Sequence, residues 1–99
     1  MLDFYLIQDN QPKPNSPEQA GLEIAGALDN DSFEYSLSKG LIDKRFDYYA
    51  DFRWGSAMIK QIHEKMNQSE FKTDSKVKKF YDLINLAFNK KCGLIAICD

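Results

Sequence analysis

The sequence contains little cysteine, proline or glycine, and it has no long apolar run. Its 99 residues include two cysteines, three prolines and five glycines. No apolar run approaches the roughly 20 residues that a membrane-spanning helix needs. Five scattered glycines match neither a phosphate-binding loop nor a dinucleotide fingerprint, and a single histidine argues against a zinc ribbon. The sequence therefore lacks a spanning segment and the common nucleotide-binding and zinc-binding motifs.

The composition suits one compact domain. Hydrophobic residues make up 43% of the chain, aromatic residues 13% and charged residues 28%, which provides enough apolar material for one core. The length fits a single domain of residues 1–99, because chains usually divide only when they are considerably longer. The formal charge is 13 − 15 = −2. Composition therefore excludes disorder, collagen and fibres, and predicts a soluble, mildly acidic protein.

The start of the sequence and its cysteines favour the cytoplasm. Met1-Leu2-Asp3 begins with an acid, and the apolar run at residues 4–7 is shorter than the apolar region of a secretory signal. If the chain from Cys92 to Cys98 is extended, six residues at about 3.3 Å each separate them by about 20 Å. A disulfide requires Cα atoms within about 7 Å. We therefore expect two free thiols, as is typical of a cytoplasmic protein.

Two almost wholly apolar segments lie at opposite ends of the chain. Residues 2–8 are rich in aromatic and β-branched types, and residues 93–98 are apolar throughout, which is typical of strands covered on both faces. Since each strand needs cover on both faces, we expect the two to be adjacent in one sheet, with the first as a central strand.

The region after the first strand is predicted to begin as a loop. Residues 11–17 contain all three prolines, which interrupt regular structure. Ser16-Pro17-Glu18-Gln19 matches a helix start, but Gly21 and Gly26 each cost a helix about 1 kcal/mol. The pattern favours a single helical turn followed by a strand at residues 22–27.

Three segments carry helical patterns. Asp31 and Glu34 form a capping box for a short helix that Gly40 ends, and Ser56 is placed to cap a helix that extends to about residue 67. A third helix has apolar residues at the spacing of one face, namely Val77, Phe80, Tyr81, Ile84, Ala87 and Phe88. These elements predict an α+β fold. It is a small single domain in which adjacent N-terminal and C-terminal strands belong to a sheet packed by two C-terminal helices and a short helix.

The strongest local anomaly is the segment 43–54, which concentrates five aromatic residues and both arginines. Trp, Tyr and Arg dominate the binding energy of protein interfaces, and burying five aromatic side chains while solvating six interleaved charges is difficult. We therefore predict that the segment contacts a partner protein through Asp43, Arg45, Asp47, Tyr48, Tyr49, Asp51, Arg53 and Trp54. The competing interpretation is that Phe46, Phe52 and Trp54 fill the core.

Three aspartates of this segment support an alternative function. Asp43, Asp47 and Asp51 recur every four residues and would line one face of a helix as a magnesium or calcium site. Three like charges at this spacing destabilise a helix, and neighbouring basic residues account for the acids as ion pairs. We therefore predict no metal, no cofactor and no catalytic residue. A small cytoplasmic hydrolase or metal-dependent enzyme that uses these aspartates is the alternative.

Two further arrangements favour structural roles. His63 would activate Cys92 or Cys98 as a nucleophile only within hydrogen-bond reach, and nothing in the sequence brings them together. A set of lysines gives the last helix a basic face: Lys72, Lys76, Lys78, Lys79, Lys90 and Lys91. Because the chain is net acidic with only two arginines, we expect this face to be solvated and not to bind nucleic acid.

Leu41-Ile42-Asp43-Lys44-Arg45-Phe46-Asp47 looks like a stretch in a family of uncharacterised bacterial proteins related to toxin antidotes. With the predicted architecture, the chain resembles small bacterial immunity-type proteins, the acidic cytoplasmic antidotes that bind and block a toxin delivered by a neighbouring cell. The resemblance implies a non-enzymatic protein whose acidic, aromatic surface occludes a partner protein, a basic toxin. The lack of a long apolar run predicts no membrane binding, and the sequence leaves the oligomeric state open.

Overall fold

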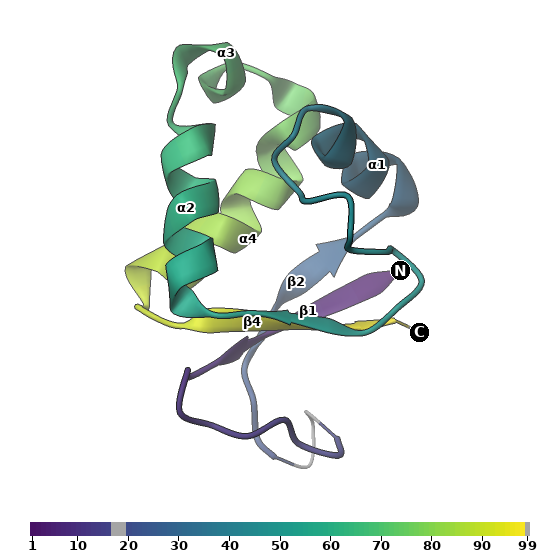
Figure 1. Ribbon diagram of the computed structural model, residues 1–99, viewed down its shortest axis with the longest axis vertical. Coiled ribbons are helices and arrows are strands. Elements are labelled where there is room, and N and C mark those ends of the chain that lie inside the picture. Colours follow the sequence, from purple (N-terminus) through teal and green to yellow (C-terminus); the bar gives the residue numbers. More distant parts are fainter. Residues whose placement is uncertain (17–19, 99) are drawn as a thin grey trace.

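Four strands form one antiparallel sheet, and the helices pack on one of its faces (Figure 1). The computed structural model describes residues 1–16 and 20–98. Along the chain the strands are β1 (Leu2–Ile7), β2 (Ile24–Leu28), β3 (Phe52–Trp54) and β4 (Gly93–Cys98). Their order across the sheet is β2-β1-β4-β3. The predicted α+β class is therefore confirmed.

The two apolar end segments are neighbours in the centre of the sheet, as predicted. β1 and β4 pair antiparallel, from Leu2 opposite Cys98 to Ile7 opposite Gly93. β1 also pairs with β2, and β4 with β3, so both strands have neighbours on each side. Because both faces of these strands are covered, their sequences do not alternate between apolar and polar residues.

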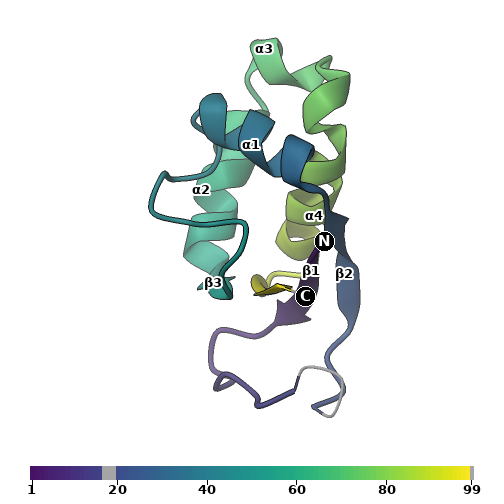
Figure 2. The same cartoon turned by 90° about the vertical axis from the view of Figure 1, so that its right-hand side faces the viewer.

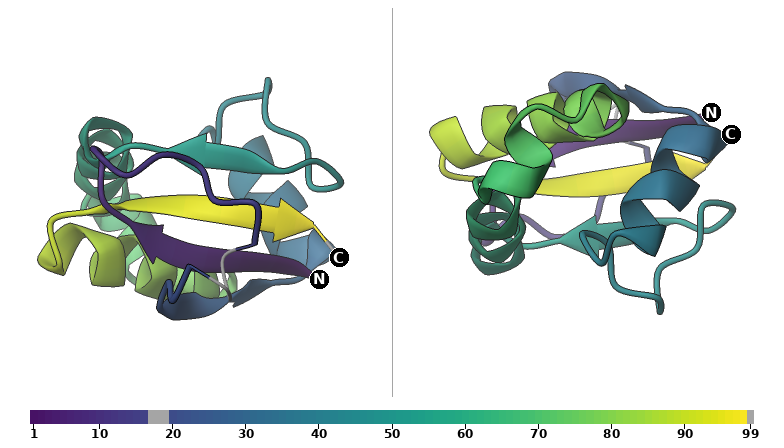
Figure 3. Two further views of the ribbon diagram at one scale, coloured as in Figure 1. Left: turned by 90° about the horizontal axis from the view of Figure 1, so that it is seen from below. Right: turned by 90° about the horizontal axis from the view of Figure 1, so that it is seen from above.

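The helices cover the face of the sheet that holds the main core (Figure 2 and Figure 3). They are α1 (Asn30–Ser38), α2 (Ser56–Met66), α3 (Ser69–Lys72), the 3-10 turn η1 (Ser75–Val77) and α4 (Lys78–Asn89). In the described part of the chain, none of them is long and apolar enough to span a bilayer. Leu2, Phe4 and Leu6 of β1 point into this core.

The buried face of α4 is close to the predicted one. Of the six apolar residues predicted to lie on one face of this helix, four are buried: Val77, Phe80, Ile84 and Ala87. Leu83 is buried as well, whereas Phe88 is 38% exposed and Tyr81 is half-buried. On a helical wheel, Leu86 lies opposite the predicted apolar face, yet it is half-buried against the core. The helix is therefore rotated slightly from the predicted orientation, because it packs on both α2 and β2.

Two helices do not use the caps predicted from sequence. Asp29, and not Asp31, caps α1, since its carboxylate accepts hydrogen bonds from the N–H and hydroxyl of Ser32 at 3.2 and 2.7 Å. Ser56 is the first residue of α2, and Gly55 is its N-cap.

The opposite face of the sheet carries a smaller core. Tyr5, Ile7 and Ile95 are buried there, and Leu22 and Ile97 pack against them. Residues 8–16 and 20–23, which lie between β1 and β2 in the sequence, are on this side of the sheet (Figure 1). This cover explains why β1 is apolar on both faces.

The strand predicted at residues 22–27 is β2, which begins two residues later than predicted, at Ile24. Its register against β1 shifts between the pairs Phe4–Gly26 and Tyr5–Ile24, so that β2 contains a bulge. The predicted helical turn at Ser16-Pro17-Glu18-Gln19 falls on residues 17–19, which lie outside the described residues.

Candidate functional site

The predicted binding segment is a loop that leads into strand β3. It follows α1 and passes the end of the sheet at which both termini lie (Figure 1 and Figure 3). Residues 43–51 contain neither helix nor strand, and we refer to them as the 43–51 loop.

Two successive turns fold the 43–51 loop. Asp43 and Asp47 each accept a hydrogen bond on the carbonyl oxygen from the N–H three residues ahead, at 3.1 and 3.2 Å. Each also accepts one on Oδ1 from the N–H two residues ahead, at 3.0 and 2.9 Å. Aspartate favours such turns because its short side chain reaches its own backbone. The four-residue spacing of these aspartates therefore reflects tandem turns and not a helix face.

Asp51 and Arg53 attach the loop to the sheet. Oδ1 of Asp51 accepts a hydrogen bond from the N–H of Cys98, at the end of β4, at 2.8 Å. Nη2 of Arg53 donates to the carbonyl oxygen of Gln8, just after β1, at 2.7 Å. Both side chains satisfy backbone groups at strand ends, so their first role is structural.

Trp54 belongs to the core. It is 1% exposed, and its ring centroid lies 5.8 Å from those of both Phe4 and Phe80. Phe46 and Phe52 are half-buried and pack against the same core. The core interpretation therefore applies to these three aromatic residues, and Trp54, which was predicted to contact a partner, is buried in this structure.

The two tyrosines of the loop differ sharply in exposure. Tyr48 is 8% exposed and packs edge-on against Phe33 at 5.6 Å, and burial raises the pKa of its hydroxyl. Tyr49 is 71% exposed, and its ring meets that of Tyr48 at 5.1 Å and 88°. The buried ring thus supports the exposed one from behind.

The predicted site residues separate into an exposed group and a buried group. The exposed members are Asp43, Arg45, Asp47, Tyr49 and Asp51, whereas Arg53 is half-buried and Tyr48 and Trp54 are buried. The Arg45 guanidinium lies 4.9 Å from the centroid of the Phe46 ring. Sequence pattern does not separate the groups, because a loop has no period from which to infer a buried face.

The three aspartates are not gathered as a metal site. The helix on which such a site depends is replaced by turns, and each carboxylate accepts a backbone N–H. Within residues 1–16 and 20–98, no group of three His, Cys, Asp or Glu side chains lies close enough to hold a metal ion. The geometry therefore provides no observation in favour of the metal-dependent alternative.

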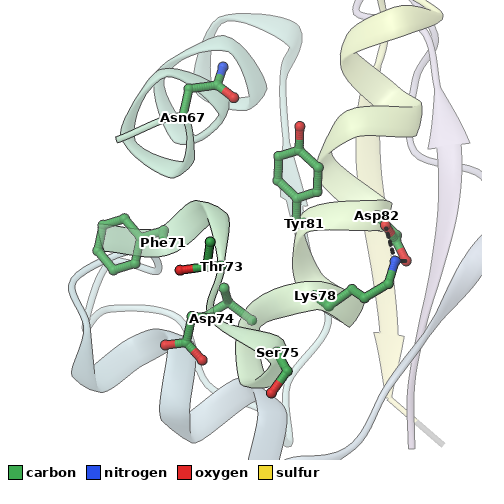
Figure 4. A pocket seen from close by; sticks show the side chains of 9 residues that line it. Asn67, Phe71, Thr73, Asp74, Ser75, Lys78, Tyr81 and Asp82 are labelled. Atoms are coloured by element: carbon green, nitrogen blue, oxygen red, sulfur yellow. Dashed lines mark hydrogen bonds and ion pairs between the residues drawn. The ribbon is translucent and has the colours of Figure 1, made fainter. Parts of the chain in front are cut away.

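A pocket of about 630 Å³ lies between the end of α2 and the start of α4 (Figure 4). Its charged side chains are engaged with one another or with α1. Asp74 accepts a hydrogen bond from the Tyr35 hydroxyl at 2.6 Å, and Lys78 pairs with Asp82 at 3.3 Å on the side away from Asn67. The pocket does not direct its titratable side chains toward one point, as a catalytic site would.

His63 lies in an aromatic stack and not beside a cysteine. Its ring is parallel to that of Phe88, with centroids 3.9 Å apart, and its nitrogens contact Asn67 and Asn85 at 3.2 and 3.4 Å. Cys92 is buried and free, burial raises the pKa of its thiol, and its Sγ lies 3.9 Å from the carbonyl oxygen of Ala87. These contacts do not support the nucleophilic dyad.

The lysines near α4 are interspersed with acids. Three of them form ion pairs at 3.3 to 3.8 Å: Lys78 with Asp82, Lys79 with Asp29 and Lys90 with Glu23. Lys76 lies over the Tyr35 ring, 5.3 Å from its centroid. Partial neutralisation leaves no continuous basic stripe among these four lysines, which is the feature that phosphate backbones require.

Comparison with protein-family models, with curated proteins and with solved structures gives no match for this chain. No comparison therefore tests the resemblance to immunity-type proteins.

Proposed function

We propose that this chain is a non-enzymatic protein-binding domain whose contact surface is the 43–51 loop. The observation that carries the proposal is the 71% exposure of Tyr49 on a loop whose turns are held by Asp43 and Asp47. A large aromatic side chain in solvent contributes little to folding. It becomes a rigid anchor when a partner covers it, which is why tyrosine is enriched among binding hot spots.

The order of the loop favours tight binding. Association costs free energy whenever it immobilises a loop or a flexible side chain. Here the two turns and the bond from Asp51 to the N–H of Cys98 already hold the backbone, and Tyr48 supports the ring of Tyr49. Less conformational freedom is therefore lost on binding than for an unsupported loop.

The charges of the loop favour a basic partner. Asp43, Asp47 and Asp51 are exposed, and they outnumber the two exposed bases of the loop, Lys44 and Arg45. Exposed charges at the rim of a contact surface accelerate association with a surface of opposite sign. Together with the resemblance to immunity-type proteins, this supports a basic toxin as the partner, bound in the cytoplasm.

The proposal is tested with the protein encoded beside this gene, because an antidote is expected beside its toxin. Calorimetry compares the parent chain with Tyr49→Ala, which should bind about 30-fold more weakly, the equivalent of about 2 kcal/mol. Its melting temperature should stay near that of the parent, because the ring is exposed. Phe88→Ala is the matched control, since Phe88 is an exposed aromatic residue on α4, away from the loop.

Two results would overturn the proposal. One is a parent chain that neither binds the neighbouring toxin nor protects cells that express it. The other is a Tyr49→Ala chain that binds as tightly as the parent while Phe88→Ala, still folded, does not. The second result would place the contact surface on the helical face.

A further inference from the structure

Arg45, an exposed residue of the 43–51 loop, lies over a neighbouring aromatic ring. Its guanidinium carbon is 4.9 Å from the centroid of the Phe46 ring. Among the residues that the structure describes, the Arg45 side chain forms no ion pair and no hydrogen bond. The five N–H donors of a guanidinium lie in a planar fork at its edge. With Phe46 below it, Arg45 therefore presents these donors to solvent or to a partner.

The acids closest to Arg45 in the sequence bind backbone groups instead. Asp43 and Asp47 each accept the N–H two residues ahead, at 3.0 and 2.9 Å, and Asp51 accepts an N–H at the end of β4 at 2.8 Å. The ion pairs expected between these acids and the neighbouring basic residues are not found within residues 1–16 and 20–98. The positive charge of Arg45 is therefore left uncompensated by these three carboxylates.

The ring beneath Arg45 is fixed by the core. The centroid of Phe46 lies 5.1 Å from that of Phe52 and 5.7 Å from that of Trp54. The backbone is held as well, because Asp43 accepts the N–H of Arg45 on its carboxylate and that of Phe46 on its carbonyl oxygen, at 3.0 and 3.1 Å. A guanidinium stacked on a fixed ring loses less freedom on binding than one that moves in solvent.

We propose that Arg45, stacked on Phe46, binds a carboxylate of the partner, so that an Asp or Glu side chain lies opposite Arg45 on an otherwise basic surface. The inference rests on the proposed function, since it names a chemical group on the partner of the 43–51 loop. A guanidinium and a carboxylate form two parallel N–H···O bonds. Because a guanidinium is less strongly hydrated than an ammonium, arginine is well suited to ion pairs that an interface covers.

Arg45 selects among basic partners. The three aspartates of the loop attract any basic surface, and this attraction mainly accelerates association. A basic surface without a matching acid would cover Arg45 with like charge, which costs affinity and disfavours that partner. The acids of the loop thus favour encounter, and Arg45 determines which of the encountered proteins stays bound.

Surface plasmon resonance with the protein encoded beside this gene tests the role of Arg45. Arg45→Ala should dissociate about 30-fold faster than the parent, and Arg45→Lys about tenfold faster, because an ammonium keeps the charge but cannot form the two parallel bonds. Lys44→Ala is the matched control, since Lys44 is the other exposed base of the loop and lies over no ring among the described residues. It should change the dissociation rate less than about twofold.

Phe46→Leu tests whether the ring positions Arg45, because it removes the ring and keeps an apolar side chain against the core. It should speed dissociation of the parent several-fold and leave the dissociation rate of Arg45→Ala unchanged. A merely structural role for Phe46 would change both rates by the same factor. Thermal melts check that each variant is folded, and if Phe46→Leu unfolds, the Arg45 variants decide alone.

A double-mutant cycle identifies the carboxylate. Each Asp and Glu of the partner is replaced by Ala in turn, and one replacement should weaken binding to the parent chain but not to Arg45→Ala. The proposal is overturned if no replacement couples to Arg45, or if Arg45→Ala dissociates at the parent rate. In both cases the proposed function stands as long as Tyr49→Ala binds more weakly than the parent. A parent chain that does not bind contradicts both proposals.

Discussion

The carboxylate of Asp9 accepts hydrogen bonds from both the backbone N–H and the hydroxyl of Ser56, which lies 47 residues later in the chain. Asp9 follows central strand β1, and Ser56 is the first residue of α2. The contact provides the acceptor that Gly55, the N-cap of α2, lacks. Arg53 donates to the carbonyl oxygen of Gln8 beside it. One junction thus joins β1, β3 and α2.

Asp9→Ala should lower the melting temperature at neutral pH. The hydrogen bonds from Ser56 hold the pKa of Asp9 below its ordinary value of 3.8. A lowered pKa contributes stability that is present above 3.8 and is lost as the pH falls through the folded-state value. The difference between Asp9→Ala and the parent should therefore shrink as the pH falls below 3.8. Thermal melts at several pH values measure it, with Glu64→Ala, an exposed acid on α2, as control. Equal melting temperatures at neutral pH would contradict the capping role.

The Tyr35–Asp74 contact between α1 and η1 should weaken at both extremes of pH. The Tyr35 hydroxyl donates to Asp74 at 2.6 Å, which raises the pKa of Tyr35 above 10.0 and lowers the pKa of Asp74 below 3.8. The contribution of Tyr35 is present below pH 10.0 and is lost as the pH rises through its raised value, whereas that of Asp74 is lost on acidification.

Tyr35→Phe tests this contact, because it removes the hydroxyl and keeps the ring. Urea unfolding across the pH range should show that the variant is less stable than the parent at neutral pH and converges with it at both ends. A constant difference at all pH values would show that the hydroxyl acts through packing and not through Asp74.

Trp54→Ala should cost about 3–5 kcal/mol of folding free energy, the range for removing a fully buried large aromatic side chain. Trp54→Phe should cost less, about 2 kcal/mol or below, for two reasons. It keeps most of the ring contacts with Phe4 and Phe80, and it removes the indole N–H, which is buried without a hydrogen-bond partner among the described residues. Urea unfolding of both variants measures the difference. Equal losses would contradict the expectation that a phenyl ring keeps the contacts with Phe4 and Phe80.

Asp47→Ala should weaken toxin binding several-fold, because the second turn loses its side-chain acceptor and the loop must be ordered on binding. Asp47→Asn keeps an oxygen that accepts the N–H of Tyr49 but removes the charge. If the carboxylate acts mainly through the turn, Asp47→Asn should dissociate from the toxin at the same rate as the parent. Only its association rate at low salt should be lower than that of the parent. Surface plasmon resonance at two salt concentrations separates the two effects. Equal dissociation rates for Ala and the parent would leave the turn without a role in binding.

Local patterns were sufficient for β1, β4 and the longer helices, whereas β3, α3 and η1 were not predicted. Residues 2–7 and 93–98 are apolar at every position but Asp3 and Gly93, and a strand with no polar face must be central, so their pairing follows from burial. The helices over 56–66 and 78–89 have apolar residues at helical spacing. The cap of α1 was misplaced by two residues, because Asp29 and Asp31 are both suitable acceptors and only the path of the chain selects one.

In the 43–54 segment, local sequence pattern does not predict which side chains are buried. Its sequence contains aromatic residues suited both to a core and to an interface, and neither composition nor spacing separates Trp54 from Tyr49. Their burial depends on residues far away in the sequence, since Phe4 and Phe80 enclose Trp54. The tandem turns were missed because a four-residue spacing of aspartates fits a helix and two turns equally well.

By itself, the sequence determined the fold class, the central pair of strands and the helical segments, because each depends on the period of apolar residues within a short stretch. Only the tertiary structure decided that Trp54 is buried and Tyr49 exposed, that Asp9 caps α2, and that β2 lies at an edge of the sheet. These features depend on which distant segments meet, and contacts of that kind form only when the whole chain is folded.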